Sequence, residues 1–297
     1  MYKYRGFGLS ILAEFEFPEL MPAEFDVADV TITYGITPQR LDGDDVVERA
    51  FSSIKKQEYL YQVKNICKYY VANGNTIVAE PLGSIDAGSV RLFLLGGAMA
   101  ALMYQRSCIP FHSSAIIKNE KLILFTGNSG AGKSTLLASL AQKGYTLFTD
   151  DICVLQQQAD GIYGTASYPM MKLWEESFTQ LDNSRLTTDF PIRPHLPKYG
   201  QFFHGSFNLQ SFPVDKLFIL TPATTQEIKI EPLHGLNAFK QLEVQAYRHQ
   251  LIANTHLRHV HFTLLSRLVA QAKTYSIIRP VANSSVEALY DVLQPLL

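Results

Sequence analysis

One stretch of the chain has residue types and spacing that could cradle a phosphate group. It runs in order through Gly127, Asn128, Ser129, Gly130, Ala131, Gly132, Lys133 and Ser134. The stretch satisfies the pattern G-x-x-x-x-G-K-[ST] without a mismatch. Its glycines let successive backbone N–H groups turn inward around an anion. The pattern therefore predicts that the Lys133 ammonium reaches the β- and γ-phosphates of a nucleotide and that the Ser134 hydroxyl ligates Mg²⁺.

The flanking residues supply the elements that this loop needs. Residues 121–126 are short, apolar and bounded by glycine, which predicts a buried strand. Residues 134–142 predict a helix that ends at Gly144, with leucines on one face. A strand, a glycine loop and a helix form the context that the phosphate pattern requires, and the helix N-terminus adds its dipole.

A pair of carboxylates follows the next predicted strand, residues 145–149, at Asp150 and Asp151. In open α/β sheets ligands bind at the carboxyl ends of strands, so we expect a neighbouring strand to bring these side chains to the same crevice. One Asp there can hold Mg²⁺, and the second suits a general base that accepts a proton from an attacking hydroxyl. Either residue alone could instead be a helix cap or a turn residue.

These motifs together resemble the catalytic domain of the HPr kinase/phosphorylase family. The resemblance rests on Phe111–Ala115 with its His112, on the glycine loop, and on Thr149-Asp150-Asp151. It implies that His112 lies beside the β- and γ-phosphates, that Asp150 is the catalytic base, and that Asp151 helps Ser134 hold Mg²⁺. Thr135 joins the loop residues as part of the expected nucleotide site.

Within this family the chain is most similar to stand-alone kinases of ribosomal peptide natural products, including the lasso-peptide precursor kinases. The similarity is carried by residues 94–106 and 168–174, and the strong matching covers roughly residues 90–175. It implies phosphorylation of a C-terminal serine. Thr135 stands where HPr kinases proper carry an acidic residue, and residues 1–85 differ from their N-terminal domain. Both departures argue against HPr as the substrate and against a reverse phosphorylase activity.

Composition excludes several other classes of function. The chain has 297 residues and a formal net charge of −1 without a basic stripe, so nucleic-acid binding has little support. Its three cysteines are few and scattered, which suggests neither a disulfide framework nor a zinc site and predicts core residues. The N-terminus lacks a signal-peptide pattern, and the most apolar run, 92–104, is too short to span a bilayer. A cytoplasmic protein that binds no membrane is the expectation, and the oligomeric state stays open.

The pattern along the chain predicts two domains. Residues 1–85 are expected to form a small, mainly antiparallel β domain, with a strand at 29–34 and a hairpin around Asn73-Gly74. Residues 44–53 predict a short helix or a loop. A linker at 81–84 should then lead into the second domain.

Residues 86–297 are expected to form an α/β P-loop kinase domain of the HPr kinase type. The expected helices are at 86–106, 133–142, 235–247, 254–273 and 285–297, and the expected strands at 110–117, 121–126, 145–149, 216–220 and 274–279, with further strands up to about 168. Residues 174–212 are the least regular stretch, and a loop of that length is usually functional or mobile. It is expected to be either a lid over the nucleotide and acceptor or a structural excursion.

The sequence therefore predicts an ATP- and Mg-dependent kinase that transfers a γ-phosphate to a serine hydroxyl of a small precursor peptide. A kinase of a sugar or another small alcohol is the nearest alternative. A nucleotide-hydrolysing switch or transport ATPase is a further one, although the chain lacks the N-K-x-D and L-S-G-G-Q motifs. The remaining alternative is a binding protein that has no catalytic activity.

Overall fold

The structure is a computed structural model. It describes residues 1–83, 86–181, 186–252, 255–281 and 285–297, without the side chains of Thr255 and His256. The chain has a mixed α/β fold and divides into two compact units. The first unit comprises Met1–Pro110 and Tyr247–Thr263, and the second comprises Phe111–Ala246 and Leu264–Leu297. The predicted domain boundary at residue 85 is therefore wrong.

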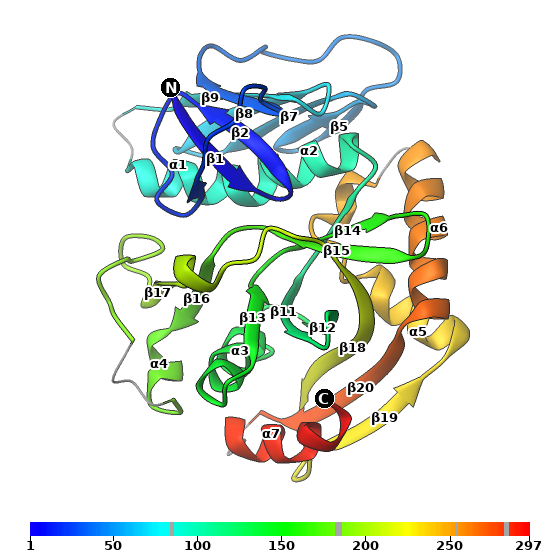
Figure 1. Ribbon diagram of the computed structural model, residues 1–297. Coiled ribbons are helices and arrows are strands. Elements are labelled where there is room, and N and C mark those ends of the chain that lie inside the picture. Colours follow the sequence, from blue (N-terminus) through cyan, green and yellow to red (C-terminus); the bar gives the residue numbers. More distant parts are fainter. Residues whose placement is uncertain (84–85, 182–185, 253–254, 282–284) are drawn as a thin grey trace. The chain divides into compact units, whose positions relative to one another are not determined.

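The first unit is built on a sheet. Within the described residues this sheet has nine strands in the order β3-β1-β2-β4-β9-β8-β7-β6-β5 (Figure 1). They are β1 (Tyr2–Gly6), β2 (Leu9–Ala13), β3 (Met21–Pro22), β4 (Val30–Tyr34), β5 (Val47–Arg49), β6 (Ser52–Ile54), β7 (Glu58–Val63), β8 (Cys67–Ala72) and β9 (Thr76–Pro81). Strand β4 runs parallel to β2 and β9, and the remaining pairs are antiparallel. The sheet is thus mainly antiparallel, as predicted.

Turn chemistry explains the hairpins of this sheet. Strands β8 and β9 pair around Asn73 and Gly74, whose φ angles of 54° and 63° lie in the left-handed region that Asn and Gly tolerate best. That hairpin confirms its prediction. Residues 44–53 were expected to be a helix or a loop, but they contain β5 and the start of β6, which pair as a hairpin. The expectation failed because the segment has no clear alternation of apolar and polar residues.

One helix of the first unit lies after residue 85, so this unit extends beyond the predicted boundary. It runs through α1 (Ala87–Phe93), the π-turn η1 (Leu94–Ala98) and α2 (Met99–Gln105), and Asp86 caps its N-terminus. The Tyr69 hydroxyl of β8 donates to the Val90 carbonyl at 2.8 Å. A Cβ on Gly97 would lie 2.8 Å from the Tyr61 ring, so only glycine allows this close approach to the sheet.

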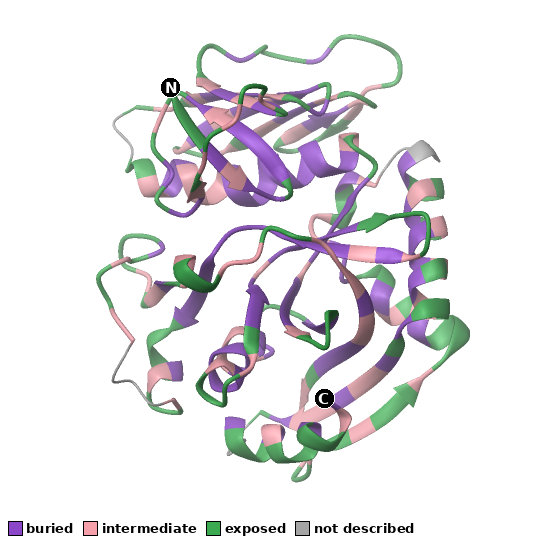
Figure 2. Cartoon of the chain, in the orientation of Figure 1, coloured by how far each residue is buried: buried purple, intermediate pink, exposed green. Residues whose placement is uncertain are grey.

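This helix is longer than the apolar run suggested. Ala87–Gln105 is long and apolar enough to cross a membrane, which corrects the sequence-based estimate, but 72% of its most apolar window is buried inside the protein. The burial is visible as the predominantly purple helix in Figure 2. Length and composition alone are therefore weak evidence for a membrane span here.

The second unit contains a mixed sheet. Among the described residues its strands follow the order β10-β14-β15-β18-β12-β11-β13, with β20 beside β18 and β19 beside β20. They are β10 (Ile109–Phe111), β11 (Ser113–Lys118), β12 (Lys121–Thr126), β13 (Thr146–Thr149), β14 (Cys153–Gln157), β15 (Ile162–Ala166), β18 (Phe212–Ala223), β19 (Lys229–Leu233) and β20 (Lys273–Pro280). Strands β12, β18 and β20 are parallel neighbours, so their carboxyl ends lie at one edge.

Helices and a small ribbon complete this unit. The helices are α3 (Lys133–Gln142), α4 (Glu175–Phe178), α5 (Gly235–Glu243), α6 (Thr255–Gln271), which crosses the unit boundary, and α7 (Val286–Leu293), with short turns η3 (His204–Ser206), η4 (His249–Leu251) and η5 (Gln294–Leu296). Strands β16 (Met170–Trp174) and β17 (Lys198–Phe202) form the separate ribbon. Helices α3 and α7 pack on each other and share one core with β12, β18 and β20.

Three details of this unit differ from the predictions. Strand β11 lies between β12 and β13, so the strand before Asp150 is one place removed from the strand before the glycine loop. The strand expected at 110–117 is interrupted at His112. The segment 174–212 is partly regular, because α4 and β17 lie within it. Its Arg185 lies outside the described residues.

Candidate functional site

The glycine loop joins the carboxyl end of β12 to the start of α3. Gly127 has a φ of 141°, and a Cβ there would lie 2.4 Å from the Leu220 carbonyl oxygen, so the position accepts only glycine. Gly132 precedes α3 with a φ of 94°, and the helix begins without a side-chain cap. The loop therefore presents an uncapped helix N-terminus, which attracts anions through its N–H groups and its dipole.

The side chains around this loop enclose a cavity of about 420 Å³, a volume within the usual range for ligand pockets. Six of the nine predicted nucleotide-binding residues line it: Ser129, Gly130, Gly132, Lys133, Ser134 and Thr135. The carbonyls of Gly127 and Asn128 accept hydrogen bonds from Lys133, and the Ala131 carbonyl accepts one from Arg279. Each predicted loop residue thus lines the cavity or supports the loop.

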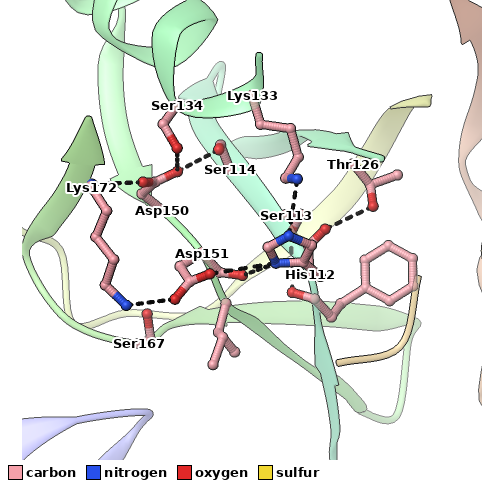
Figure 3. A network of polar contacts seen from close by, with 12 residues as sticks. His112, Ser113, Ser114, Thr126, Lys133, Ser134, Asp150, Asp151, Ser167 and Lys172 are labelled. Atoms are coloured by element: carbon pink, nitrogen blue, oxygen red, sulfur yellow. Dashed lines mark hydrogen bonds and ion pairs between the residues drawn. The ribbon is translucent and has the colours of Figure 1, made fainter. Parts of the chain in front are cut away.

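Asp150 is buried at the floor of the cavity and is held from three sides (Figure 3). Its Oδ1 accepts hydrogen bonds from the Ser114 hydroxyl at 2.5 Å and from the Ser134 hydroxyl at 3.0 Å. Its Oδ2 accepts from the Lys172 backbone N–H at 3.1 Å. Three donors fix this carboxylate beside the loop serine, even though β11 separates the strands that carry the two residues.

Asp151 has a different environment. Its side chain is 19% exposed, and its Oδ2 lies 2.7 Å from the Lys172 ammonium. Its Oδ1 lies 3.5 Å from His112 Nδ1. The backbone of Asp151 has a φ of 71°, a left-handed conformation that Asp adopts more readily than most residues. Burial alone would raise the pKa of Asp151, but the charge of Lys172 and its hydrogen bond to the carboxylate hold that pKa below its usual value.

His112 links the acid pair to the glycine loop. Its Nδ1 lies 2.9 Å from the Asp151 carbonyl oxygen, and its Nε2 lies 3.0 Å from the Lys133 ammonium. A carbonyl can only accept and an ammonium can only donate, so the ring is neutral with its proton on Nδ1. Burial lowers the pKa of His112 and so favours this neutral form. The Lys133 charge also lowers that pKa, whereas the Asp151 charge raises it. In this arrangement His112 positions its two neighbours and is not itself poised to accept a proton.

Contacts behind the ring fix the backbone of His112. The Thr126 hydroxyl lies 2.8 Å from the His112 carbonyl oxygen and 3.0 Å from Gln245 Oε1, so these two acceptors share its single proton. The His112 N–H donates to the Gln245 carbonyl at 2.9 Å. Residues from β12 and from the turn after α5 therefore hold the position where β10 ends and β11 begins.

Lys133 lies under the loop and is almost completely buried. Its ammonium donates to the Gly127 carbonyl at 2.8 Å in addition to its contact with His112. Burial lowers the pKa of Lys133 to about 8, while Asp150 and Asp151 oppose the shift. The side chain remains cationic at neutral pH, at the place where the sequence pattern predicts phosphate contacts.

The cavity is also lined by residues that sequence reasoning did not assign to the site. Lys172 and Trp174 of β16 and Lys198 of β17 line it, and Glu176, Ser177 and Gln180 join from α4 and the turn after it. Ser114, which donates a hydrogen bond to Asp150, was also missed. Lys172 lies within the motif 168–174 and Lys198 within the segment 174–212, but nothing in their spacing to Asp150 indicated contact. Part of the predicted lid segment therefore lines the cavity.

Comparison with known proteins adds little to this geometry. No protein-family model and no curated protein sequence matches the chain. One solved structure that matches is the Hpr(Ser) kinase/phosphatase from Coxiella burnetii, at 12% identity, covering 63% of this chain and 97% of that chain. The TM-score is 0.32, too low for an argument from the match.

Proposed function

We propose that the protein is an ATP- and Mg-dependent kinase that transfers the γ-phosphoryl group to a hydroxyl, with a serine of a small peptide as the acceptor. One observation carries the proposal. The glycine loop, Lys133, Ser134 and both predicted carboxylates line a single cavity, although they come from separate parts of the sequence. Phosphoryl transfer needs these groups together, because its catalysis consists of positioning and charge stabilisation.

The residues present fit a magnesium ion. Ser134 Oγ and Asp150 Oδ1 lie 3.0 Å apart, and both are hard oxygen donors of the kind that Mg²⁺ prefers. Mg²⁺ is typically held by one or two carboxylates together with substrate phosphates. When bound, it would neutralise charge on the β- and γ-phosphates. We therefore assign the metal to Ser134 and Asp150.

This assignment reverses the division of roles that the resemblance implied for the two carboxylates. Asp150 is 1% exposed and already accepts three hydrogen bonds, so an acceptor hydroxyl has poor access to it. Asp151 is more exposed and lines the same cavity. We assign the general base to Asp151, with Lys172 and His112 holding its carboxylate in place.

The proposed reaction follows from these positions. Lys133 and the loop N–H groups hold the phosphates, while Asp151 accepts the proton of the acceptor hydroxyl. A bond forms between the acceptor oxygen and the γ-phosphorus as the bond to the β–γ bridging oxygen breaks. That oxygen leaves with the electron pair on ADP. The depressed pKa of Asp151 makes it a weak base, so its contribution is mainly orientation of the hydroxyl.

A sugar or polyol is the second candidate acceptor, and one observation favours it. Glu176, Ser177 and Gln180 line the cavity close together, and a polyol needs several convergent polar groups. Trp174 favours the peptide, because this residue is 39% exposed and lines the same cavity, where it offers apolar contact to a side chain.

The test combines an acceptor panel with matched Asp→Asn variants. The protein is incubated with Mg²⁺·ATP and either Ser-terminated peptides or common sugars and polyols, and a mass gain of one phosphate is followed. Asp151→Asn should lower the turnover number by on the order of 10²-fold while nucleotide binding persists. Asp150→Asn should instead raise the Mg²⁺ concentration needed for half-maximal activity. Asp215→Asn is the control, since Asp215 pairs with Lys121 away from the cavity.

Each outcome has a defined meaning. Turnover of a sugar with no peptide modified at comparable concentration would replace the peptide by the second candidate. Release of phosphate to water, with every acceptor unmodified, would indicate a nucleotide-hydrolysing protein instead. If Asp150→Asn loses turnover and Asp151→Asn loses metal affinity, the roles are those that the resemblance implied.

A further inference from the structure

We propose that Arg279 is a positioning residue for phosphate binding, because it turns the backbone N–H of Gly132 toward the cavity. This role rests on the proposed function, since the phosphates of a nucleotide are the anion that the N–H would meet. Arg279 lies near the carboxyl end of β20, where it pairs in register with Pro222 of β18. Strand β18 also pairs with β12, which leads into the glycine loop, so Arg279 starts from the edge that carries the loop (Figure 1).

The guanidinium group of Arg279 contacts the loop backbone directly. Its Nε donates to the Ala131 carbonyl at 2.9 Å. A Cβ on Gly132 would lie 2.9 Å from Nη2, 3.4 Å from Cζ and 3.6 Å from Nε, so the whole group packs against this glycine. Gly132 lines the cavity, and Arg279 is not among the lining residues. Arg279 therefore supports the loop without being part of the cavity wall.

The hydrogen bond to Ala131 fixes the peptide group that joins this residue to Gly132. A trans peptide is planar, and its C=O and N–H are oriented in opposite directions. Holding the Ala131 carbonyl toward Arg279 therefore holds the Gly132 N–H away from Arg279. Within the described part of the chain, this N–H has no hydrogen-bond acceptor. An unpaired N–H on a residue that lines the cavity is suited to an anion.

The charge of Arg279 strengthens the same donor. Among the described residues no carboxylate forms an ion pair with Arg279, whose second hydrogen bond runs from Nη1 to the Pro280 carbonyl at 3.4 Å. Burial lowers the pKa of Arg279, but a guanidinium stays protonated at neutral pH. A cation bonded to a peptide carbonyl polarises that peptide and makes its N–H a better donor. Arg279 thus orients the Gly132 N–H and also increases its attraction for phosphate.

Lys133 does not duplicate this contact. Its ammonium donates to the carbonyls of Gly127 and Asn128, at the beginning of the loop. When a nucleotide binds, the proposed phosphate contacts of Lys133 compete with these two carbonyls. The Arg279 side chain is not part of the cavity wall, so its bond to the Ala131 carbonyl remains available in the occupied loop.

The first experiment compares two substitutions of similar length at Arg279. Arg279→Met removes the donor, whereas Arg279→Gln places a neutral amide N–H near the position of Nε. Inorganic tripolyphosphate and a non-hydrolysable ATP analogue are each titrated with Mg²⁺ by calorimetry. Arg279→Met should raise both Kd values by roughly ten- to a hundredfold, the effect of losing one charge-assisted hydrogen bond. Arg279→Gln should recover about fivefold of that loss because it keeps a neutral hydrogen bond.

Arg267→Met is the matched control, because Arg267 is exposed on α6. This variant should leave both Kd values unchanged. The thermal midpoint of every variant is recorded with the affinities. The KM of the acceptor should stay within about twofold in Arg279→Met, since the lost donor faces the phosphates.

A spectroscopic measurement tests the orientation of the N–H itself. The sequence contains two Ala-Gly pairs, Ala87-Gly88 and Ala131-Gly132, so ¹³C-carbonyl alanine with ¹⁵N-glycine selects two amides. Tripolyphosphate should shift the Gly132 amide proton of the wild type downfield, while Gly88 near the start of α1 should not move. In Arg279→Met the Gly132 amide should respond less at saturating tripolyphosphate. A role limited to stability would lower the thermal midpoint without changing this response.

The outcomes separate this role from the proposed function. If Arg279→Met weakens tripolyphosphate binding as expected but no acceptor gains phosphate, the role stands and the kinase fails. Transfer to an acceptor, with Kd values in Arg279→Met within twofold of the wild type, would overturn the role and leave the kinase in place. Equal losses in Arg279→Met and Arg279→Gln would also overturn it, since charge alone would account for the effect. If Arg279→Met does not fold, a wild-type Gly132 amide that ignores tripolyphosphate is sufficient to overturn the role.

Discussion

Nucleotide affinity should fall as the pH rises through about 8, because Lys133 then loses its proton. Burial lowers the pKa of Lys133 from 10.5 to about 8, and Asp150 and Asp151 only partly oppose that shift. From the definition of the pKa, the protonated fraction falls from about 0.9 at pH 7 to about 0.1 at pH 9. If only the ammonium form holds the phosphates, Kd should rise about tenfold over this interval, or about 1.4 kcal/mol.

The same shift has a consequence for folding with a defined sign. The folded protein binds this proton less tightly than the unfolded chain does. The unfolded state therefore holds more protons at this residue between pH about 8 and the ordinary lysine pKa of 10.5, and the free energy of unfolding contributed by Lys133 rises with pH across that window. Weaker nucleotide binding at pH 9 thus cannot be attributed to a loss of stability from this lysine.

The assay uses the fluorescence of Trp174. It is the chain's only tryptophan and it lines the cavity, so ligand binding should change its emission. Mg²⁺·ATP is titrated at pH 7, 8 and 9 into the wild type and into Lys133→Arg, whose guanidinium stays charged throughout. The variant should show little change in Kd with pH, whatever its absolute affinity. A wild-type Kd that is flat between pH 7 and 9 would refute the assignment of the phosphates to a lysine with a lowered pKa.

Four further outcomes follow from individual contacts. Lys133→Ala should abolish transfer and weaken nucleotide binding, and wild-type activity in that variant would remove the phosphate-loop assignment. Gly127→Ala should lower the thermal midpoint more than Gly130→Ala does, because only the first would bring a Cβ to 2.4 Å from a carbonyl oxygen; equal midpoints would contradict the loop geometry. Asp86→Ala should cost about 1 kcal/mol in denaturant unfolding, since its carboxylate caps α1 through Ser89 N at 2.7 Å. Leu136→Ala should cost about 2–5 kcal/mol because Leu136 is fully buried in the α3 core, and a loss below about 1 kcal/mol would place that helix face outside the core.

Local patterns in the sequence were enough to predict the glycine loop with its flanking strand and helix. The loop depends on short-range rules, because residues such as Gly127 and Gly132 need φ values that few other residues adopt. The strand at 121–126, the helix ending near Gly144 and the hairpin at Asn73-Gly74 have the same origin, since apolar spacing and turn residues act over a few positions. The three cysteines are buried and free, as their apolar neighbours predicted.

Only the tertiary structure decided which distant residues meet. The sequence predicts that Asp150 and Asp151 follow a strand, but the insertion of β11 between β12 and β13 and the contact of Asp150 with Ser134 depend on long-range strand pairing. Lys172 reaches Asp151, and Lys198 lines the same cavity, because a ribbon pairs two strands that are far apart in the sequence. The helix at 87–105 belongs to the first unit because its packing on β8, rather than its position in the chain, determines where its apolar face is buried. Such contacts are set by the shape of the packed core, which no short window of sequence contains.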